Sequence, residues 1–268
     1  MKAILTIAGS DSSSGAGIQA DLKTIAHFGG YGLCAVTSIV AEVPGDVRSI
    51  HITPPKILAD QLSVLAEHFT IAAVKTGMLA TAESATVVAD FLDRNPDIPL
   101  VVDPVLVASS GQNLTEADTI EVYRNRLIAR ALVTTPNYAE IRALLDSKSI
   151  DPSQLAAEFV ARFQAPVLLK GGHLPENSPR PEEATDLYRD VETSFELTTP
   201  RLDLPDTHGT GCTLSAAIAA VYEADLPIFD VLSQAKNYLT RALIEAHEFP
   251  RPNDAPLRAL NHFPKGVS

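Results

Sequence analysis

Short apolar runs alternate with longer amphipathic stretches along most of the chain, and this alternation limits the possible folds more than any other feature. The apolar runs predict buried strands over residues 3–8, 33–41, 71–75, 99–102, 131–135 and 166–170. Apolar residues at helical spacing predict helices over residues 17–28, 54–69, 82–93, 115–128, 137–145, 153–164, 212–223 and 227–246. Such an alternation is typical of a mainly parallel sheet with helices on both faces. Nothing in the composition marks a linker, so we expect one α/β domain over residues 1–268.

Three other segments lie outside this alternation. Residues 185–190 and 193–199 predict a β-hairpin, and the polar, proline-rich residues 174–183 predict a loop. Three prolines within seven residues, starting at Pro250, predict an irregular tail. Thr81 is expected to cap the helix over residues 82–93, because its side chain can accept a hydrogen bond from a free backbone N–H.

The charge balance narrows the range of partners. The chain has 33 Asp and Glu against 21 Lys and Arg, a net charge of −12, whereas proteins that bind nucleic acids usually carry a basic patch. No apolar run reaches the roughly 18 residues that a transmembrane helix needs, so we expect no membrane partner. Two cysteines, Cys34 and Cys212, are too few for a disulfide scaffold, which favours a reduced protein of the cytoplasm.

The strongest local motif is HGTGCT, residues 208–213, directly before an alanine-rich helix. Gly209 and Gly211 let the backbone approach a ligand closely. The N–H groups that follow point outward from a helix N-terminus, where an anion is favoured. The motif therefore predicts a site for a transferred phosphoryl group, with a glycine turn that binds nothing as the alternative.

Cys212 lies in the first turn of that helix. A thiol in this position is expected to have a lowered pKa and to be partly thiolate. It is then suited to take a proton from a substrate hydroxyl. The alternative is a small packed side chain, because cysteine is among the most often buried residues. For Cys34, inside an apolar strand, we prefer packing.

A second glycine-rich segment, GSDSSSGAG at residues 9–17, joins the first strand to the first helix. It is no phosphate-binding loop of the Gly-Lys-Ser/Thr type, and it lacks the third glycine of a dinucleotide fingerprint. Asp11, within it, falls at the carboxyl end of the first strand. The segment predicts either a flexible turn or a functional element, which would be a lid or part of a substrate pocket.

Other polar side chains follow the predicted strands at their carboxyl ends, where ligands bind in such folds. Asp103 and Glu140 are candidate ligands of Mg²⁺, which takes oxygen ligands and keeps several waters. Asn137 shares a helix face with Glu140. Lys170 and Lys236 each offer a point charge to a phosphate. The alternatives are a helix N-cap for Asn137 and solvated charges for Glu140 and the two lysines.

Six segments in this order resemble the hydroxymethylpyrimidine and phosphomethylpyrimidine kinases of thiamine biosynthesis, which have the ribokinase-like fold. The segments are GSDSSSGAGIQADLKT, KTGML, VVDPVLVASSG, TPNYAEI, VLLKGGH and HGTGCTLSAAIAA. The resemblance runs from about residue 3 to about residue 245. It implies ATP- and Mg²⁺-dependent phosphorylation of a hydroxymethyl group on a small heteroaromatic ring, followed by phosphorylation of the monophosphate. It also implies a homodimer.

The resemblance assigns roles to residues that match the family's motifs. The anion hole would consist of Gly209, Thr210, Gly211 and Cys212, with Cys212 in the position of the catalytic base. Asp103 and Glu140 would organise Mg²⁺ and the phosphates. The nucleotide contacts would be Asn137, Lys170 and Lys236. The residues around the pyrimidine would be Gly9, Asp21, Glu42 and Met78.

Glu42 is where the chain departs from the family. The family usually has TAQNT after the second strand, and its Gln contacts the ring, whereas this chain has VAEVP. An ionised carboxylate only accepts hydrogen bonds, whereas an amide also donates. Burial would raise the pKa of Glu42 and favour a neutral, donating form. Otherwise Glu42 would favour a ring with a hydroxyl donor, such as pyridoxine, or it faces water on a displaced loop.

Two other functions therefore stand beside the pyrimidine kinase. The first is a pyridoxine or pyridoxal kinase of the same fold, for which Glu42 is the reason. The second is a ligand-binding relative that has lost turnover. The intact Gly-Thr-Gly-Cys motif, Asp103, Glu140 and Lys170 argue against this second function.

Overall fold

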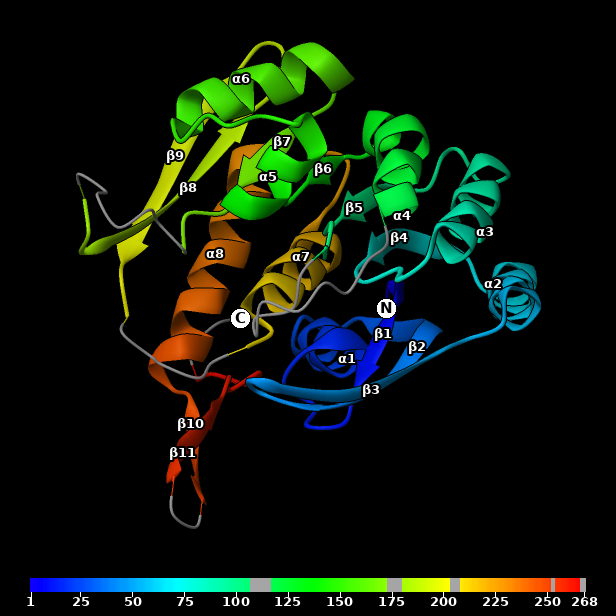
Figure 1. Ribbon diagram of the computed structural model, residues 1–268, viewed down its shortest axis with the longest axis horizontal. Helices are drawn as coiled ribbons and strands as arrows, with labels where there is room; N and C mark the ends of the chain where they lie inside the picture. The colour runs from blue at the N-terminus through cyan, green and yellow to red at the C-terminus, as the bar shows by residue number, and fades with distance from the viewer. Residues whose placement is uncertain (107–116, 173–179, 203–207, 252–253, 266–268) are drawn as a thin grey trace.

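A computed structural model describes residues 1–106, 117–172, 180–202, 208–251 and 254–265 of the chain, and the predicted strands and helices form most of it (Figure 1). The strands are β1 (Ala3–Asp11), β2 (Tyr31–Val43), β3 (Asp46–Ile52), β4 (Ile71–Thr76), β5 (Leu100–Val102), β6 (Val133–Thr134), β7 (Val167–Leu169), β8 (Glu183–Arg189), β9 (Ser194–Pro200), β10 (His247–Arg251) and β11 (Asp254–Ala259). The helices are α1 (Gly17–His27), α2 (Pro55–His68), α3 (Ala82–Asp93), α4 (Ala117–Val122), α5 (Tyr138–Leu145), α6 (Pro152–Phe163), α7 (Thr210–Val221) and α8 (Ile228–Ile244). A π-helical turn, η1 (Tyr123–Leu127), and a 3-10 turn, η2 (Ile128–Arg130), follow α4.

The main sheet has the strand order β3-β2-β1-β4-β5-β6-β7-β8-β9 among the described residues. Strand β1 pairs in parallel with β2 and with β4, and the parallel pairing continues through β7. Strands β3, β8 and β9 are antiparallel to their neighbours at the two edges. The prediction of a mainly parallel sheet is confirmed, and the predicted hairpin, now β8 and β9, extends one edge of it.

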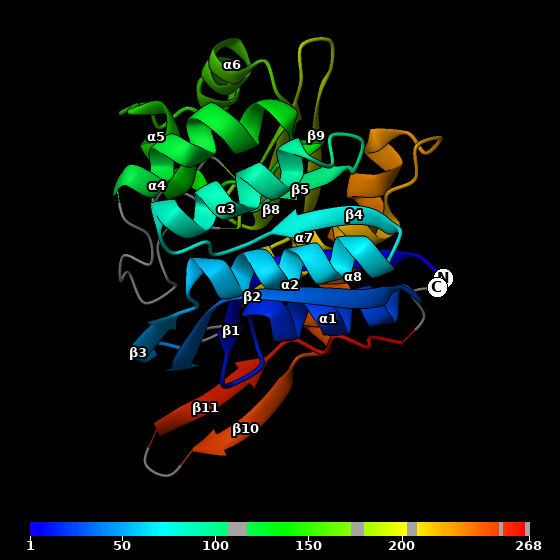
Figure 2. The same ribbon diagram turned by 90° about the vertical axis from the view of Figure 1, so that its right-hand side faces the viewer.

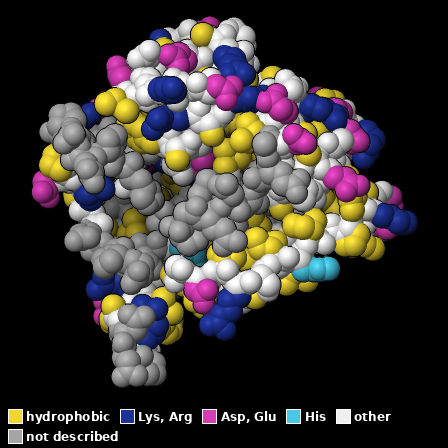
Figure 3. Space-filling view, in the orientation of Figure 1, with side chains coloured by type: hydrophobic (Ala, Val, Ile, Leu, Met, Phe, Trp, Pro, Cys, Tyr) yellow, Lys and Arg dark blue, Asp and Glu magenta, His cyan; other side chains and the backbone are white. Residues whose placement is uncertain are grey.

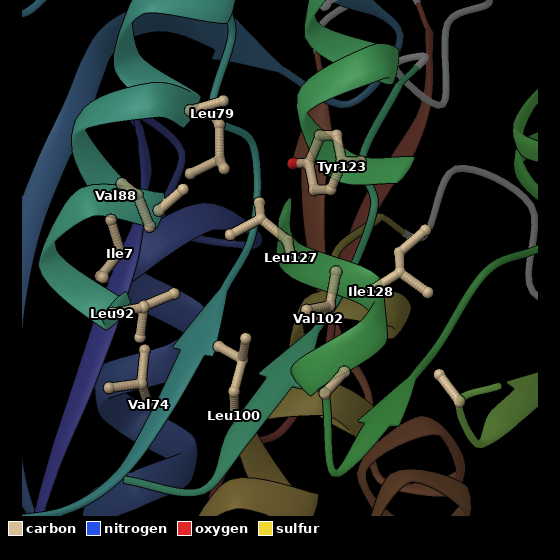
Figure 4. Packing of buried hydrophobic residues seen from close by; sticks show 14 of the residues in the cluster. Ile7, Val74, Leu79, Val88, Leu92, Leu100, Val102, Tyr123, Leu127 and Ile128 are labelled. Carbon is tan, nitrogen blue, oxygen red and sulfur yellow. The ribbon is translucent and has the colours of Figure 1, made fainter. Parts of the chain in front are cut away.

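Helices cover both faces of this sheet because its central strands, β1 and β4 to β7, are buried on both sides. On β1, Leu5 and Ile7 enter one core with α2, α3 and α6, whereas Ile4 enters a second core with α7 and α8. Figure 2 shows α2 and α3 along one face. Figure 4 shows the first core from close by, with residues of β1, β4 and β5 against α3, η1 and η2.

Two predicted helix caps are present. Thr81 accepts a hydrogen bond from the Ser84 N–H at 3.2 Å, as expected for the start of α3. Asn137 and Glu140 form a reciprocal capping box at the start of α5, with Asn137 Oδ1 accepting from the Glu140 N–H at 2.9 Å and Glu140 Oε2 from the Asn137 N–H at 2.7 Å. The expected N-cap at Asn137 is thus confirmed, and Glu140 is buried rather than solvated.

The predicted helix over residues 115–128 is wrong in detail. Its first two residues lie outside the described ranges, and the rest divides into α4, η1 and η2. The wider π turn accommodates the bulky side chain of Tyr123 in the core, where its hydroxyl donates to the Gly77 carbonyl at 3.0 Å. Residues 174–179 of the predicted polar loop also lie outside the described ranges.

The irregular tail is a further correction, because β10 and β11 form an antiparallel hairpin that projects from the main sheet (Figures 1 and 2). The pairing skips Pro250, between Phe249 and Arg251, since proline has no N–H to donate. A two-stranded ribbon with free edges tolerates such a gap. Strand β3 is a further difference, because no strand was expected between residues 41 and 54.

The surface agrees with the charge balance of the sequence. On the face drawn in Figure 3, Lys and Arg side chains are interspersed with Asp and Glu, so the coloured residues there form no continuous basic patch. Within the described ranges, no helix has both the length and the apolar character that crossing a membrane requires.

Candidate active site

The parallel strands bring the predicted polar groups to one edge of the sheet. Strand order reverses at β1, which has β2 on one side and β4 on the other, and ligands bind beside such switch points. Asp11 ends β1, Asp103 follows β5 and Lys170 follows β7. Gly209 then starts α7 beneath the sheet centre.

Asp103 and Lys170 form a buried ion pair at this edge. Lys170 Nζ lies 2.8 Å from Asp103 Oδ1 and 3.7 Å from Glu140 Oε2. Hydroxyls of Thr135 and Ser215 donate to the same Asp103 carboxylate, each at 3.3 Å. Burial lowers the pKa of Lys170, but the two acids more than offset this and the pKa is raised, so the ammonium stays charged. Burial raises the pKa of Glu140 to about 7, against the opposing charge of Lys170.

The start of α7 faces this ion pair. Gly209 has φ +79°, and a Cβ there would overlap the Gly15 carbonyl oxygen, so only glycine fits. A Cβ at Gly211 would lie 2.9 Å from Lys170 Nζ. The first bond of the helix joins the Thr213 N–H to the Gly209 carbonyl at 2.9 Å, so the N–H groups of Thr210, Gly211 and Cys212 precede it. Backbone donors next to a lysine make a cradle for an anion.

The expected lowered pKa of Cys212 is wrong. Burial raises the pKa of this thiol to about 11, and the positive charge of Lys75 and the Gly17 N–H offset only part of that effect. The carboxylates of Asp21 and Asp103 raise it further. The helix N-terminus is thus outweighed by desolvation and two nearby acids, and Cys212 is a thiol at neutral pH. Its role as a base stays a prediction.

Asp21 and Lys75 form a second buried ion pair, close enough to Cys212 for both to affect the pKa of its thiol. The two carboxylate oxygens of Asp21 are 2.9 and 2.8 Å from Lys75 Nζ, and Thr6 Oγ1 donates to this carboxylate at 2.6 Å. Both charged side chains are completely buried. Lys75 was missed by the sequence analysis, although a lone lysine inside an apolar strand is itself a sign of a buried partner. Contact between Asp21 and a substrate stays a prediction.

Gly9 and Met78, two of the residues expected around a pyrimidine, lie together. A Cβ at Gly9 would come 2.6 Å from Met78 Cε and 2.7 Å from Ser38 Oγ. Met78 also packs with Val40 and Ala80 in a small apolar cluster at the end of β2. The structure therefore places an apolar wall beside the end of β1.

Glu42 lies at a register shift between β2 and β3, and it is half-buried rather than turned fully to water. Its N–H donates to Ser12 Oγ at 3.2 Å, which ties it to the loop after β1. Burial raises the pKa of Glu42 to about 7, Asp11 adds to this rise and His208 opposes it. The carboxyl group is thus within electrostatic reach of the site, and its contact with a ligand stays a prediction.

Asp11 and His208 lie in two motifs noted in the sequence, but their pairing was not predicted. His208 Nε2 lies 2.8 Å from Asp11 Oδ2. Burial would raise the pKa of Asp11, but hydrogen bonds from His208 and Ser13 and the charge of His208 lower it to about 2. A carboxylate followed by small residues in GSDSSSG is the sequence signal, because Asp side chains bond the backbone of the turn that follows them.

Lys236, the third expected nucleotide contact, is buried and lies 2.8 Å from Asp186 Oδ2. The other oxygen of Asp186 accepts from the Gly171 N–H at 2.8 Å, so this pair supports the turn directly after Lys170. Contact of Lys236 or Asn137 with a nucleotide stays a prediction.

Within the described ranges, no three His, Cys, Asp or Glu side chains cluster as a metal cage. Asp103 and Glu140 both lie beside Lys170, which occupies the space close to Asp103. Two carboxylates beside an anion cradle fit Mg²⁺, because this ion takes few protein ligands and keeps waters and substrate phosphates.

A family model described as phosphomethylpyrimidine kinase matches residues 11–255. The chain belongs to this family. It is 41% identical over 247 residues to the hydroxymethylpyrimidine/phosphomethylpyrimidine kinase of Rhizobium meliloti, covering 90% of each protein. It is 38% identical to a probable thiamine biosynthetic bifunctional enzyme of rice, of which it spans only 44% of the length. The chain likewise spans 46% of the bifunctional relative from Arabidopsis thaliana.

Two solved structures confirm the ribokinase-like α/β fold. The ADP complex of Bacillus subtilis pyridoxal kinase has a TM-score of 0.84 at 31% identity, covering 98% of each chain. The phosphomethylpyrimidine kinase of Clostridium difficile 630 has a TM-score of 0.77 at 31% identity, covering 90% of this family member and 99% of that chain.

The buried pair under the site gives a stability prediction. Lys75→Met removes the partner of a fully buried carboxylate, so we expect the free energy of unfolding to fall by about 3–5 kcal/mol. Unfolding in urea measures this free energy. The control is Lys56→Met, which breaks an exposed pair with Asp60 and is expected to change it by at most about 1 kcal/mol. Equal losses in the two variants would contradict the prediction.

Proposed function

We propose that the protein is an ATP-dependent kinase that phosphorylates 4-amino-5-hydroxymethyl-2-methylpyrimidine and then its monophosphate, in thiamine biosynthesis. The observation that carries this is the anion cradle of Gly209–Cys212 set against Lys170 and Asp103, in a chain that matches the phosphomethylpyrimidine kinase family over residues 11–255. Phosphoryl transfer requires positioning and charge neutralisation more than covalent chemistry, and these groups supply both.

The cradle N–H groups and Lys170 bind the phosphates from two sides. The N–H groups of Thr210, Gly211 and Cys212, which precede the first bond of the helix, stabilise negative charge on the transferred group. Lys170 neutralises phosphate charge from the other side, and Asp103 fixes the direction of its ammonium. Asp103 and Glu140 would hold Mg²⁺ in the proposed site, and the bound ion would supply further charge neutralisation on the phosphates.

Cys212 has a narrower role in this mechanism than the sequence suggested. A thiol with a pKa of about 11 holds its proton at neutral pH. The sulfur still lies at the N-terminus of α7, where it can accept a hydrogen bond from the substrate hydroxyl and orient it. Proton loss from that hydroxyl can follow transfer, since the transition state for phosphoryl transfer is largely dissociative.

Pyridoxal or pyridoxine phosphorylation is the second candidate function. Glu42 favours it, because a carboxylate at this position accepts a hydrogen bond from a ring hydroxyl, which pyridoxine has. The likeness to a pyridoxal kinase over 98% of each chain supports the same alternative. The pyrimidine kinase is the better supported of the two, because the relative from R. meliloti, at higher identity, carries that name.

The decisive measurement supplies the purified protein with ATP, Mg²⁺ and one acceptor at a time. We expect hydroxymethylpyrimidine to give its mono- and diphosphate, identified by mass, and pyridoxine to react more slowly. Absence of product from both pyrimidines would contradict the proposal, and turnover of pyridoxine alone would establish the alternative. In the same assay, Cys212→Ala with wild-type activity would exclude the base role and leave the kinase intact.

The pKa of Glu42 gives a pH prediction. Below pH 7 the protonated carboxyl donates to a pyrimidine nitrogen as an amide would, and above it the carboxylate has no proton to donate. We expect kcat/KM for hydroxymethylpyrimidine to fall about tenfold between pH 6 and 8, and Glu42→Gln to remove this fall. Exposed Glu67→Gln is the control and should keep the wild-type profile. A Glu42→Gln profile that still falls would refute the contact.

A homodimer in the cytoplasm is part of the proposal. Support for association comes from an apolar stripe on the exposed side of β2, where Ile39, Ala41 and Val43 lie in the open. Support for a reducing compartment comes from two free cysteines. Light scattering should give about twice the 28.6 kDa of one chain, and Ile39→Lys with Val43→Lys should give the monomer. A wild-type monomer at micromolar concentration would contradict the dimer.

A further inference from the structure

Two glycine-containing loops press against each other at the site. One is the β1–α1 loop, residues 12–16, and the other is the turn formed by His208 and Gly209. A Cβ at Gly15 would lie 2.7 Å from His208 Cε1, and a Cβ at Gly209 would overlap the Gly15 carbonyl oxygen. The two loops are packed with no free space between them, so a displacement of one loop must displace the other.

Asp11 fixes the shape of the first loop. Its Oδ2 accepts from the N–H groups of Gly15 at 2.9 Å and Ala16 at 2.7 Å. Its Oδ1 accepts from the N–H and the hydroxyl of Ser13 at 2.7 and 2.8 Å. Asp11 is completely buried, and hydrogen bonds to an ionised acceptor are about twice as strong as neutral ones. The loop is thus held as a fixed turn, which argues against the lid considered from the sequence.

His208 connects this fixed loop to α7. Its Nε2 lies 2.8 Å from Asp11 Oδ2 and 3.2 Å from Ser13 Oγ. An ionised carboxylate only accepts, so Nε2–H is the donor. Nδ1 is buried and has no hydrogen-bond partner among the residues that the structure describes. The polar contacts that the structure gives the ring therefore run to Asp11, at the end of β1, and to Ser13 in the β1–α1 loop, and the next residue, Gly209, is the N-cap of α7.

We propose that His208 is a positioning residue, which with Asp11 and Ser13 sets the first turn of α7 against the β1–α1 loop. It acts through the cradle N–H groups and Cys212 and does not touch the substrate. Its expected effect on turnover rests on the proposed kinase function. Its effect on the placement of Cys212 does not.

The chain contains a matched control in His262. His262 is also buried, and its Nε2 lies 3.2 Å from Thr213 Oγ1, so it too bonds α7 near its start. It reaches the helix from the C-terminal segment instead of from the β1–α1 loop. A purely structural account predicts that loss of either histidine has the same consequences.

The first test follows the placement of Cys212 without any substrate. The variants are His208→Leu, His208→Gln and His262→Leu, and the probe is iodoacetamide, with modified peptides quantified by mass. We expect His208→Leu to speed alkylation of Cys212 about tenfold, the effect of losing one hydrogen bond to a charged group. Cys34, on β2, should react at an unchanged rate in the same sample and serves as the internal reference.

The variant His208→Gln distinguishes the effect of the hydrogen bond to Asp11 from the effect of the size of the imidazole ring. Gln carries an amide nitrogen at about the position of Nε2, so His208→Gln should stay within threefold of wild type in Cys212 alkylation. His262→Leu should leave Cys212 alkylation unchanged even where it lowers the melting temperature. If His208→Leu does not fold, His208→Asn replaces it, because its shorter amide does not reach Asp11.

The second test measures kinetics with hydroxymethylpyrimidine. We expect His208→Leu to lower kcat about 100-fold with KM within threefold of wild type, because a misplaced cradle weakens transition-state stabilisation more than substrate binding. His208→Gln should recover most of kcat, and His262→Leu should keep it.

Three outcomes would each overturn the proposal. The first is the same change in the His208→Leu and His262→Leu variants, and the second is an unchanged rate of Cys212 alkylation in His208→Leu. The third is a His208→Gln variant that alkylates as fast as His208→Leu. A wild-type protein without activity on pyrimidines or pyridoxine would overturn the kinase function instead. The alkylation rates would still decide the positioning role of His208.

Discussion

The ion pair between Lys170 and Asp103 is the interaction on which the rest of the site depends. It joins the ends of β7 and β5 directly in front of α7, and both hydroxyls that orient Asp103 come from neighbouring elements. An unpaired charge at this depth would be strongly destabilising, so the two groups must stay together. Because Lys170 lies against Gly211, the pair also sets how closely the first turn of α7 approaches the sheet.

Two further buried carboxylates, Asp21 and Asp11, also hold groups from separate elements together. Asp21 holds Lys75 below the site, and Asp11 holds a whole turn and His208 beside it. Each buried acid is satisfied by donors from at least two elements, so the backbone around it is fixed by charge as well as by packing. The raised pKa of Cys212 follows from this arrangement, since Asp21 and Asp103 both oppose a thiolate there.

Local patterns in the sequence predicted the fold well because the central strands β1, β4, β5, β6 and β7 are buried on both sides, and helices such as α3, α6 and α8 each have one buried face. Thr81 and Asn137 were predictable as caps because capping depends on a few adjacent residues. The pairs Asp11–His208 and Lys75–Asp21 join residues 197 and 54 positions apart, so a local pattern can mark one member of a pair but does not identify its partner. The predicted lowering of the Cys212 pKa was wrong because this pKa depends on burial and on all the charges that the fold brings near the thiol. The hairpin after Ile244 was missed because proline in a strand is tolerated at unpaired edges.

Glu42 differs from the rest of the site in how it is held. The cradle, Lys170 and Asp11 are locked by glycines, buried charges and several donors each, whereas Glu42 lies at a register shift beside the edge strand β3, with its backbone braced by Ser12. Substitutions at the end of β2 therefore disturb few contacts, whereas substitutions in the cradle disturb many. In the proposed function, this separation lets ring preference change during evolution at the end of β2 while the proposed phosphate cradle stays unchanged.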